Sequence, residues 1–371
     1  MKINKSTENK LGSFVRKLRI EKKIGQRELA KKLNISASYL NDIEKNKRQT
    51  PNNEVIKKLS TILEVKKELL FDLAASNKVP IDIEKYLIEN QNLISLIRSI
   101  KENKISDDEI LNMQNSINIK NSKALIVAAG LGSRLKHHTE TLPKCMLKFG
   151  GKTLLERQLE VYKNCGIENI SLIRGYKKNK INYKNINYFD NDDFKNNNIL
   201  NSIFYAEEVI NGNIIIGYSD ILFDETVVKR LMDSDHDISI VVDIDWRGYY
   251  VNRKDHPIEE AENVIFNANN EVIKIGKIGT QKEDVHGEFI GMMKLNKNGC
   301  RIFKDNFHRV KKLYWDKPFQ RAKIFQKSYL TDILQELADI GFKIHCVIIE
   351  KGWKEIDTVE DYQKSLIEFN E

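Results

Sequence analysis

The chain has few cysteines and no long apolar run. Its four cysteines, Cys145, Cys165, Cys300 and Cys346, are scattered and form no C-x-x-C pair, which indicates reduced thiols rather than a disulfide framework. No apolar stretch approaches the roughly 20 residues that a membrane helix needs. The first ten residues lack the apolar segment of a signal peptide, and the sequence contains no repeats or low-complexity tracts. These absences predict a cytoplasmic protein with no membrane partner.

The composition suits two or more globular domains. The chain has 371 residues, of which 41% are hydrophobic, as expected for domains with real cores. The charge is uneven along the chain. Residues 1–75 carry 18 Lys and Arg against nine Asp and Glu, although the whole chain has a formal charge of only +8. The remaining residues are therefore nearly neutral together, and the basic N-terminal segment points to a polyanion as its partner.

A glycine-rich turn follows an apolar, strand-like run at 124–129. The turn reads GLGSR at 130–134, and Lys144 follows Arg134 by ten residues. Glycines let the backbone approach a phosphate and expose its N–H groups, and both cations add charge for the same anion. The turn lacks the Lys-Ser/Thr pair of a P-loop and the third glycine of a dinucleotide fingerprint, since position 135 is Leu. These residues point to a nucleoside triphosphate site, with an ordinary strand-to-helix turn as the alternative.

Three linked patterns resemble the sugar-phosphate nucleotidyltransferase superfamily. They are G-x-G-x-R-L at 130–135, T-x-x-x-P-K at 139–144 and FGGK at 149–152. The resemblance implies that the glycine loop wraps the triphosphate, and that Arg134 and Lys144 are catalytic residues that stabilise the transition state and the pyrophosphate. It implies nucleotide binding by Ala128, Ala129, Gly130, Leu131, Gly132 and Ser133.

Two aspartates are candidate metal ligands. Asp220 comes just after the apolar run 214–216, and Asp357 lies in EIDTVEDY at 355–362. Carboxylates in such places can hold a divalent cation at a triphosphate, although either aspartate could instead cap a turn or a helix. The superfamily has metal-binding aspartates in matching contexts, which implies that Asp220 and Asp357 bind Mg²⁺.

The rest of this region resembles the phosphocholine and phosphonate cytidylyltransferases. The resemblance rests on an Asn-rich segment at 196–202, on the runs 243–264, 271–277 and 287–295, and on IDTVEDY. It implies transfer of CMP from CTP to a small acceptor that is phosphocholine-, phosphonate- or phospho-amino-acid-like, with nucleotide contacts from Asn201, Ser202 and Tyr218. A uridylyl- or guanylyltransferase acting on a sugar 1-phosphate is the nearer alternative.

Charged residues in these runs are candidates for the acceptor pocket. Cations there would bind a phosphate or phosphonate, and carboxylates would bind an amine or hydroxyl. We predict acceptor binding by Arg253, Lys277 and Glu288, and we keep Arg247, His256 and Glu262 as further candidates, with a surface ion pair as the alternative for each. Because His256 has no partner His or Cys at metal-ligand spacing, a zinc site is not expected.

The basic segment shows helical periodicity with short breaks. Ser36 is a suitable N-cap after the turn at 34–36, and Pro51 separates two further helical stretches. The string at 25–51 resembles the Cro-repressor-type helix-turn-helix family, whose second helix enters the major groove of DNA, usually as a dimer on two half-sites. The match implies base-edge contacts by Ser36, Ala37, Ser38, Tyr39 and Asn41, and backbone contacts by Gln26, Lys45, Lys47 and Arg48. A module used only for protein interaction or dimerisation is the alternative.

The chain is thus expected to form three segments and an α/β fold. Residues 1–75 would form an all-α helix-turn-helix domain, residues 76–122 a helical extension and linker, and residues 123–371 a nucleotidyltransferase domain. In the last of these, apolar runs at 170–173, 214–216, 238–242 and 344–349 alternate with helical runs at 153–164 and 200–209. That alternation predicts a doubly wound, mostly parallel, Rossmann-like sheet.

The predicted function combines both domains. A CTP-dependent cytidylyltransferase, working as a homodimer, would regulate its own pathway through DNA. The alternative from another class is a transcriptional regulator whose transferase-like domain only senses a nucleotide or metabolite. The presence of Gly132, Arg134, Lys144, Asp220 and Asp357 together favours activity, because a sensor has little need of both metal carboxylates.

Overall fold

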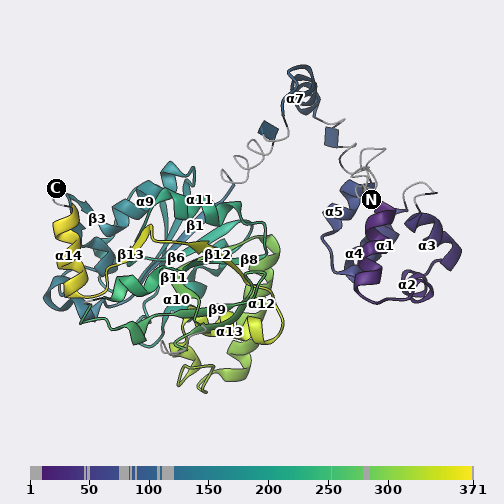
Figure 1. The fold of residues 1–371 in the computed structure, drawn as a ribbon. Helices are drawn as coiled ribbons and strands as arrows, with labels where there is room; N and C mark the ends of the chain where they lie inside the picture. Colours follow the sequence, from purple (N-terminus) through teal and green to yellow (C-terminus); the bar gives the residue numbers. More distant parts are fainter. Residues whose placement is uncertain are drawn as a thin grey trace. The chain divides into compact units, whose positions relative to one another are not determined.

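The computed structural model describes residues 11–45, 47, 51–74, 83, 86–87, 90–106, 109–110, 121–251, 253–278 and 285–369. The chain divides into two units, residues 1–107 and 108–371. Figure 1 shows the first as a set of helices and the second as helices around a sheet. The division falls inside the segment that we expected to be an extension and linker, so the limits of our three segments stay predictions.

The described helices of the N-terminal unit are α1 (Leu11–Glu21), α2 (Gln26–Leu33), α3 (Ala37–Glu44), α4 (Asn53–Leu63), α5 (Lys67–Ala74) and α7 (Gln91–Glu102). Helices α1 to α5 enclose one apolar core that includes Val15, Leu29 and Leu40. The hydroxyl of Ser36 accepts a hydrogen bond from the N–H of Tyr39, which confirms the N-cap of α3. Helices α2 and α3 with the turn between them form the expected helix-turn-helix.

A nine-stranded sheet forms the centre of the second unit. Its strands are β1 (Lys123–Ala128), β4 (Asn169–Arg174), β5 (Ile186–Asp190), β6 (Ile214–Tyr218), β8 (Ile238–Asp243), β9 (Asn263–Phe266), β10 (Val272–Gly276), β11 (Gly287–Leu295) and β12 (His345–Ile349). The order is β10-β9-β11-β6-β1-β4-β5, and β8 pairs with β11 and β12. Since β11 is antiparallel to β6, β8 and β9, and β10 to β9, all strands except β10 and β11 point the same way. The mostly parallel sheet is confirmed.

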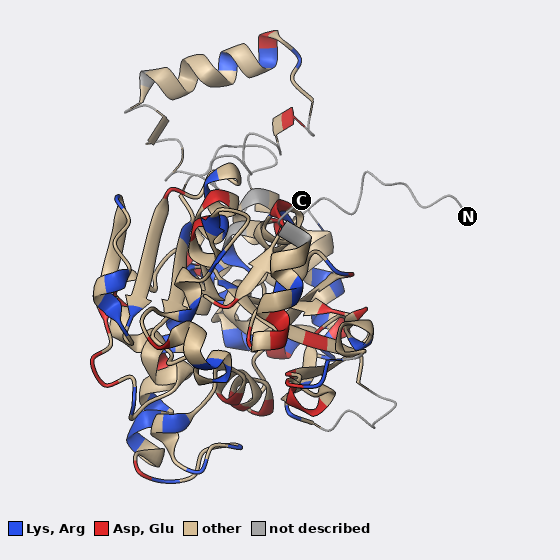
Figure 2. Ribbon diagram, turned by 90° about the vertical axis from the view of Figure 1, so that its left-hand side faces the viewer, with Lys and Arg blue, Asp and Glu red and all other residues tan. Residues whose placement is uncertain are grey.

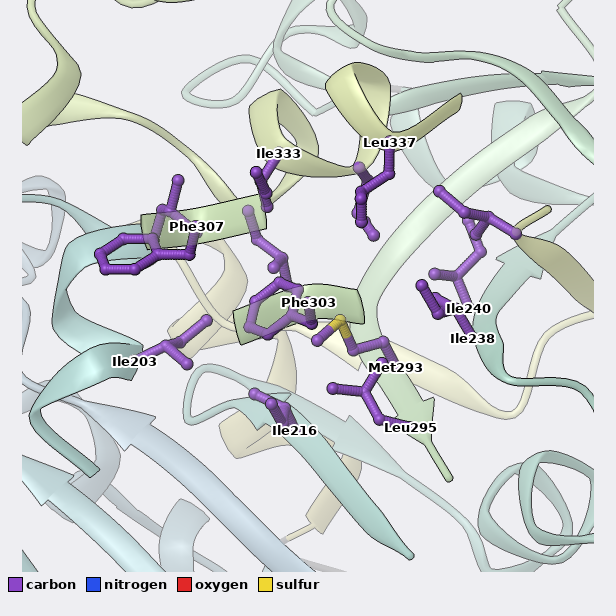
Figure 3. Packing of buried hydrophobic residues seen from close by; sticks show 14 of the residues in the cluster. Ile203, Ile216, Ile238, Ile240, Met293, Leu295, Phe303, Phe307, Ile333 and Leu337 are labelled. Atoms are coloured by element: carbon purple, nitrogen blue, oxygen red, sulfur yellow. The ribbon is translucent and has the colours of Figure 1, made fainter. Parts of the chain in front are cut away.

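Helices cover both faces of this sheet, as a doubly wound fold requires. Along β6, Ile214 and Ile216 belong to one apolar cluster and Ile215 to the other. The first cluster packs against α10 (Ile199–Ile203), α12 (Lys297–Tyr314) and α13 (Leu330–Asp339), and Figure 3 shows Phe303 and Phe307 of α12 within it. The second packs against α9 (Leu154–Asn164) and α11 (Glu225–Asp233).

Smaller elements complete the second unit. β2 (Lys148–Phe149) pairs with β3 (Lys152–Thr153), β7 (Ile221–Phe223) pairs with β13 (Trp353–Glu355), and the last helix is α14 (Val359–Phe369). The helical run that we predicted at 200–209 is interrupted, because α10 ends at Ile203 and the following 3₁₀ segment is kinked at Ala206.

Two further properties concern the whole described chain. None of its described helices has both the length and the apolarity to cross a membrane. Acidic and basic residues are both spread over its helices and strands (Figure 2).

Candidate functional site

The glycine loop leaves the sheet at the carboxyl end of two parallel strands. In the pairing of β1 with β6, Val127 lies opposite Tyr218, so the segments that follow these strands emerge at the same edge. The N–H of Ser219 donates to the carbonyl oxygen of Val127 (3.2 Å), which fixes the chain after β6 beside β1. This edge is where ligands bind in open α/β sheets.

Gly132 is a position whose backbone conformation and close neighbours favour glycine. Its φ is +62°, and a Cβ placed there would lie 3.0 Å from Cβ of Lys144 and 3.3 Å from Cγ2 of Thr139. The hydroxyl of Thr139 donates to the carbonyl oxygen of Gly132 (3.0 Å), so the loop is held from within. The glycine conformation thus brings the loop backbone directly against Lys144.

Lys144 joins the two aspartates that we predicted as metal ligands. Its Nζ lies 2.9 Å from Oδ2 of Asp220 and 2.6 Å from Oδ1 of Asp357, and only 8% of the residue is exposed. Burial opposes the charge of this ammonium group, but Asp220 and then Asp357 outweigh it and raise the pKa of Lys144. Burial likewise opposes the charge of Asp357, but Lys144 and then His256 outweigh it and hold the pKa of Asp357 below its usual range. Both groups therefore stay charged in the folded chain.

Pairing of β7 with β13 explains why these aspartates meet. Asp220 directly precedes β7, Asp357 follows β13, and the N–H of Ile356 donates to the carbonyl oxygen of Asp220 (2.8 Å). Arg134 forms an ion pair with Asp357. The four residues at the centre of our sequence prediction are thus in contact, although their roles stay predictions.

The carboxylates suit a divalent cation. Oδ1 of Asp220 is buried without a hydrogen-bond partner in the described chain, and one positive charge, that of Lys144, already lies between both aspartates. Asp357 does not cap α14, because the N–H of Asp361 is bound instead by the hydroxyl of Thr358 (3.2 Å). Asp220 and Asp357 can therefore hold Mg²⁺ with oxygen ligands of the kind that this ion prefers.

The three predicted acceptor residues have different surroundings. Lys277 is exposed and pairs with Glu260, whose pKa is lowered first by Lys277 and also by the charge of Arg134. Glu288 is buried and accepts a hydrogen bond from the hydroxyl of Tyr250. Burial raises the pKa of Glu288 well above its usual range. Its Oε2 has no hydrogen-bond partner among the described residues.

Arg253 is buried and contacts several groups of the protein. Its Nε and Nη2 donate to the two carboxylate oxygens of Asp361 (2.8 Å each), and Nη2 also lies 3.2 Å from Glu355. The guanidinium lies against the rings of Tyr249 and Tyr250, and its side chain is 1% exposed. Its Nη1 is buried without a hydrogen-bond partner among the described residues, and acceptor binding by Arg253 stays a prediction.

Sequence reasoning missed Glu355, Asp361 and the position of His256. Nδ1 of His256 lies 3.2 Å from Oδ2 of Asp357 and 3.4 Å from Oε2 of Glu355. Spacing along the chain did not indicate this group, since the histidine and its partners lie about a hundred positions apart. The other further candidates have protein partners: Glu262 pairs with Arg321 (2.6 Å), and the Arg247 guanidinium lies over the ring of Trp246.

The Asn-rich segment forms a polar network near β5. The side-chain amide of Asn201 donates to the carbonyl oxygen of Phe325 (2.9 Å), and the hydroxyl of Ser202 accepts from Asn191 (3.0 Å). Tyr218 lies over Gly291 of β11, where a Cβ would meet its ring at 2.3 Å. All three predicted nucleotide contacts thus have structural roles, and their binding of a nucleotide stays a prediction.

The helix-turn-helix exposes four of its nine predicted DNA contacts. Ser36, Ser38, Lys45 and Lys47 are exposed, and Ala37, Tyr39 and Asn41 are partly buried. The side-chain amide of Gln26 donates a hydrogen bond to Glu44 (2.9 Å). Glu44 is itself buried and forms an ion pair with Arg19. Arg48 lies outside the described residues.

Two family models match the chain. Residues 12–76 match a helix-turn-helix domain, and residues 124–272 match the MobA-like NTP transferase domain. The CTP:phosphoglutamine cytidylyltransferase of Campylobacter jejuni is 28% identical over 251 residues, which are 65% of this chain and 97% of that protein. The choline-phosphate cytidylyltransferase of Streptococcus pneumoniae is 35% identical over 105 residues, which are 27% of this chain and 46% of that protein.

A solved structure supports the fold independently. The inositol-1-phosphate CTP transferase from T. maritima matches with a TM-score of 0.51 at 21% identity, covering 67% of this chain and 96% of that chain. At this identity the likeness concerns the fold alone. The chain therefore carries a helix-turn-helix domain followed by a MobA-like NTP transferase domain, and its relatives include cytidylyltransferases.

Proposed function

We propose that the chain is a cytidylyltransferase, which transfers CMP from CTP to a small phosphorylated or phosphonate acceptor and releases pyrophosphate. The observation that carries the proposal is the contact of Lys144 with Asp220 and Asp357 beside the glycine loop, since it gathers cations and carboxylates where a triphosphate would lie. The choice of CTP is supported by the match to 97% of a CTP:phosphoglutamine cytidylyltransferase. The same match favours an acceptor in which the phosphate is joined to an amino acid or amine.

The residues would act by positioning and by neutralising charge. Backbone N–H groups of residues 130–133 would bind the triphosphate, and Arg134 and Lys144 would neutralise charge on the α-phosphate and on the leaving pyrophosphate. An acceptor oxygen forms a bond to the α-phosphorus as the bond from that phosphorus to the β-phosphate oxygen breaks. A phosphate dianion is already a nucleophile, so no general base is required. Mg²⁺, held by Asp220 and Asp357, would supply further positive charge at the phosphates when bound.

Two residues would shape the acceptor side. Lys277 is exposed, its partner Glu260 also feels the charge of Arg134, and Lys277 could bind the acceptor phosphate after leaving Glu260. Glu288 has a buried oxygen without a hydrogen-bond partner in the part of the chain that is described, and it could accept a hydrogen bond from an acceptor amine or hydroxyl. Satisfying a buried polar atom in this way discriminates strongly against analogues that lack the donor.

Pyrophosphate release in Mg²⁺ tests the proposal. Each nucleoside triphosphate is paired with a panel of phosphoglutamine, phosphocholine, 2-aminoethylphosphonate, 2-hydroxyethylphosphonate, glycerol phosphates and hexose 1-phosphates. Release with CTP and one acceptor, lost in Lys144→Met and kept in Lys229→Met, supports the proposal. Lys229 is a fair control because it is an exposed lysine that pairs with Glu225 on the surface of α11.

Other outcomes identify the alternatives. Release with UTP or GTP and a hexose 1-phosphate would show that the chain is a uridylyl- or guanylyltransferase acting on a sugar phosphate. Tight nucleotide binding without release from any pair would favour a domain that senses a metabolite. Either result contradicts the cytidylyltransferase proposal.

We also propose that the helix-turn-helix binds DNA as a homodimer. Support comes from the exposed polar residues at the start of α3 and from the excess of Lys and Arg in residues 1–75. Binding would be measured by fluorescence anisotropy on fragments selected from random duplexes, at several salt concentrations. Asn41→Ala should cost about 1–3 kcal/mol on the selected site only, whereas Lys45→Ala should weaken all duplexes alike and lower the salt slope by about 1. Failure to select any sequence would contradict the proposal, and sedimentation would test the dimer.

A further inference from the structure

A buried histidine and two carboxylates converge beside the candidate active site. One ligand atom from each of His256, Glu355 and Asp357 lies within 4.8 Å of the other two, which is close enough for all three to hold one metal ion. They come from separate parts of the fold: His256 lies between β8 and β9, whereas Glu355 ends β13 and Asp357 follows it. The proposed transfer uses only Asp357, so it leaves the other two residues without a role.

The histidine offers a nitrogen atom with no hydrogen bond. The His256 side chain is 5% exposed, and its Nδ1 lies 3.2 Å from Asp357 and 3.4 Å from Glu355 without forming a hydrogen bond within the described residues. Leaving such an atom unsatisfied in the interior is unfavourable, so buried nitrogen atoms normally have partners. Oδ2 of Asp357 is also buried without a hydrogen bond, although Arg134 pairs with it. A bound cation would satisfy both atoms at once.

The nearby charges leave a place for one more cation. The carboxylates of Asp220, Glu355, Asp357 and Asp361 are joined by ion pairs to Lys144, Arg134 and Arg253. Four carboxylates therefore face three permanent cations, with the His256 ring as the further contact of Glu355 and Asp357, and a buried charge without compensation is unfavourable. Glu355 has the weakest compensation of the four, because its contact with Arg253 is 3.2 Å long and Arg253 is already bound to Asp361 through two nitrogen atoms.

We infer that His256, Glu355 and Asp357 bind a divalent transition-metal ion, separate from the Mg²⁺ proposed between Asp220 and Asp357. One imidazole nitrogen with two carboxylate oxygens suits Mn²⁺, Fe²⁺ or Zn²⁺, whereas Mg²⁺ prefers oxygen ligands. Asp357 is common to both sets, with Oδ1 toward Lys144 and Oδ2 toward His256. The inference goes beyond the proposed transfer and does not depend on it, since the three ligands belong to the protein alone.

Pulsed electron paramagnetic resonance on the full chain tests this site directly. Protein stripped of metals is loaded with one equivalent of Mn²⁺, and the spin-echo modulation from a bound ¹⁴N nucleus is recorded. The wild-type chain should show imidazole modulation. His256→Gln should abolish it and weaken Mn²⁺ binding at least tenfold. His308→Gln is the matched control, because His308 also pairs with a carboxylate, that of Glu207, but on the surface of α12.

Asp220→Asn separates the two ions. This variant should keep the ¹⁴N modulation, because Asp220 is not one of the three ligands. Loss of modulation in Asp220→Asn would mean that His256 binds the same ion as Asp220, and the separate site would be overturned. Absence of Mn²⁺ binding, or binding without ¹⁴N modulation, in the wild-type chain would also overturn it, and this reading needs no variant to fold. Pyrophosphate release in Mg²⁺ alone is measured separately, so failure of the transfer proposal can be distinguished from failure of the metal-site proposal.

Discussion

Nζ of Lys144 lies 2.6 Å from Oδ1 of Asp357, although 213 positions separate the two residues in the chain. The same ammonium group reaches Asp220, so one buried cation joins the segments after β6 and β13 to the glycine loop. Removing one member of a buried pair leaves the other charge uncompensated. This contact therefore serves both the stability of the second unit and the chemistry proposed for it.

Lys144→Met should impair activity and stability together. Loss of one positioned charge at a transition state typically lowers kcat by about 10²–10³, and breaking a buried pair costs about 3–5 kcal/mol. Millimolar Mg²⁺ should recover part of the lost stability, because it can compensate Asp220 and Asp357 in place of the ammonium group. Urea unfolding with and without Mg²⁺, with kcat from pyrophosphate release, measures both effects. Stability equal to that of Lys229→Met would count against the buried contact.

Gly132→Ala should destabilise the chain more than Gly130→Ala. Alanine at position 132 must adopt a φ of +62° and approach Lys144 to 3.0 Å, whereas a Cβ at Gly130 meets nothing within 4 Å. The left-handed conformation alone costs about 1–2 kcal/mol, and displacement of Lys144 should add to it. Thermal unfolding of the two variants side by side gives the comparison. Equal melting temperatures would show that the loop relaxes without strain.

Glu288→Gln should make the protein less sensitive to alkaline pH. Because burial raises the pKa of Glu288, the folded chain holds this proton more tightly than the unfolded chain. The resulting stabilisation is fully present below about pH 4.3, the ordinary pKa of a glutamate, and is lost as pH rises toward the raised pKa. Glutamine is uncharged throughout, so the variant should equal wild type near pH 4 and exceed it near pH 8.

Melting temperatures between pH 4 and pH 8 test the Glu288 prediction. A constant difference between the two proteins across this range would refute it. The same variant provides a second reading, because loss of the carboxylate should raise KM for the acceptor more than KM for the nucleotide if Glu288 binds the acceptor.

The thiols should be inert in the folded protein. All four cysteines are buried, and burial raises the pKa of Cys145 and of Cys346 to about 12 and that of Cys300 to about 11. Thiolate is the reactive form, so a disulfide reagent at pH 8 should label none of the four in the native state and all four in guanidinium. Rapid labelling of the native chain would contradict the packing around β1, β12 and α12.

The central residues of the candidate site were predictable because each lies in a local pattern. Gly132 and Asp220 come shortly after apolar strands, and parallel strands end at one edge of a sheet, so these two were expected to lie together. Asp357 was indicated only by the resemblance of its own motif, and it reaches the others because β13 pairs with β7 in a separate antiparallel sheet. The antiparallel strands β10 and β11 were not indicated, because a buried strand has the same apolar pattern in either direction.

Arg253 and His256 were beyond this reasoning. Their surroundings depend on where β13 and α14 return to the segment after β8, and no periodicity near either residue specifies that return. Arg253 is a residue type expected in an acceptor pocket, yet its guanidinium donates a hydrogen bond to Asp361, which lies 108 positions later in the chain. For His256, spacing of possible ligands along the chain was a poor guide, because Glu355 and Asp357 are supplied by tertiary packing.

The packing of β13 and α14 also affects the order in which the two units can fold during synthesis. Asp357 lies just before α14, and Asp361 in that helix binds Arg253, so the second unit is completed by residues that are synthesised after all strands of its sheet. Domains generally fold as units during synthesis, from the N-terminus onward, at about 5–20 residues per second. A ribosome that stalls before β13 would therefore release a chain whose helix-turn-helix can fold while Lys144 still lacks Asp357. Truncated translation products would thus keep the first unit and lose the second.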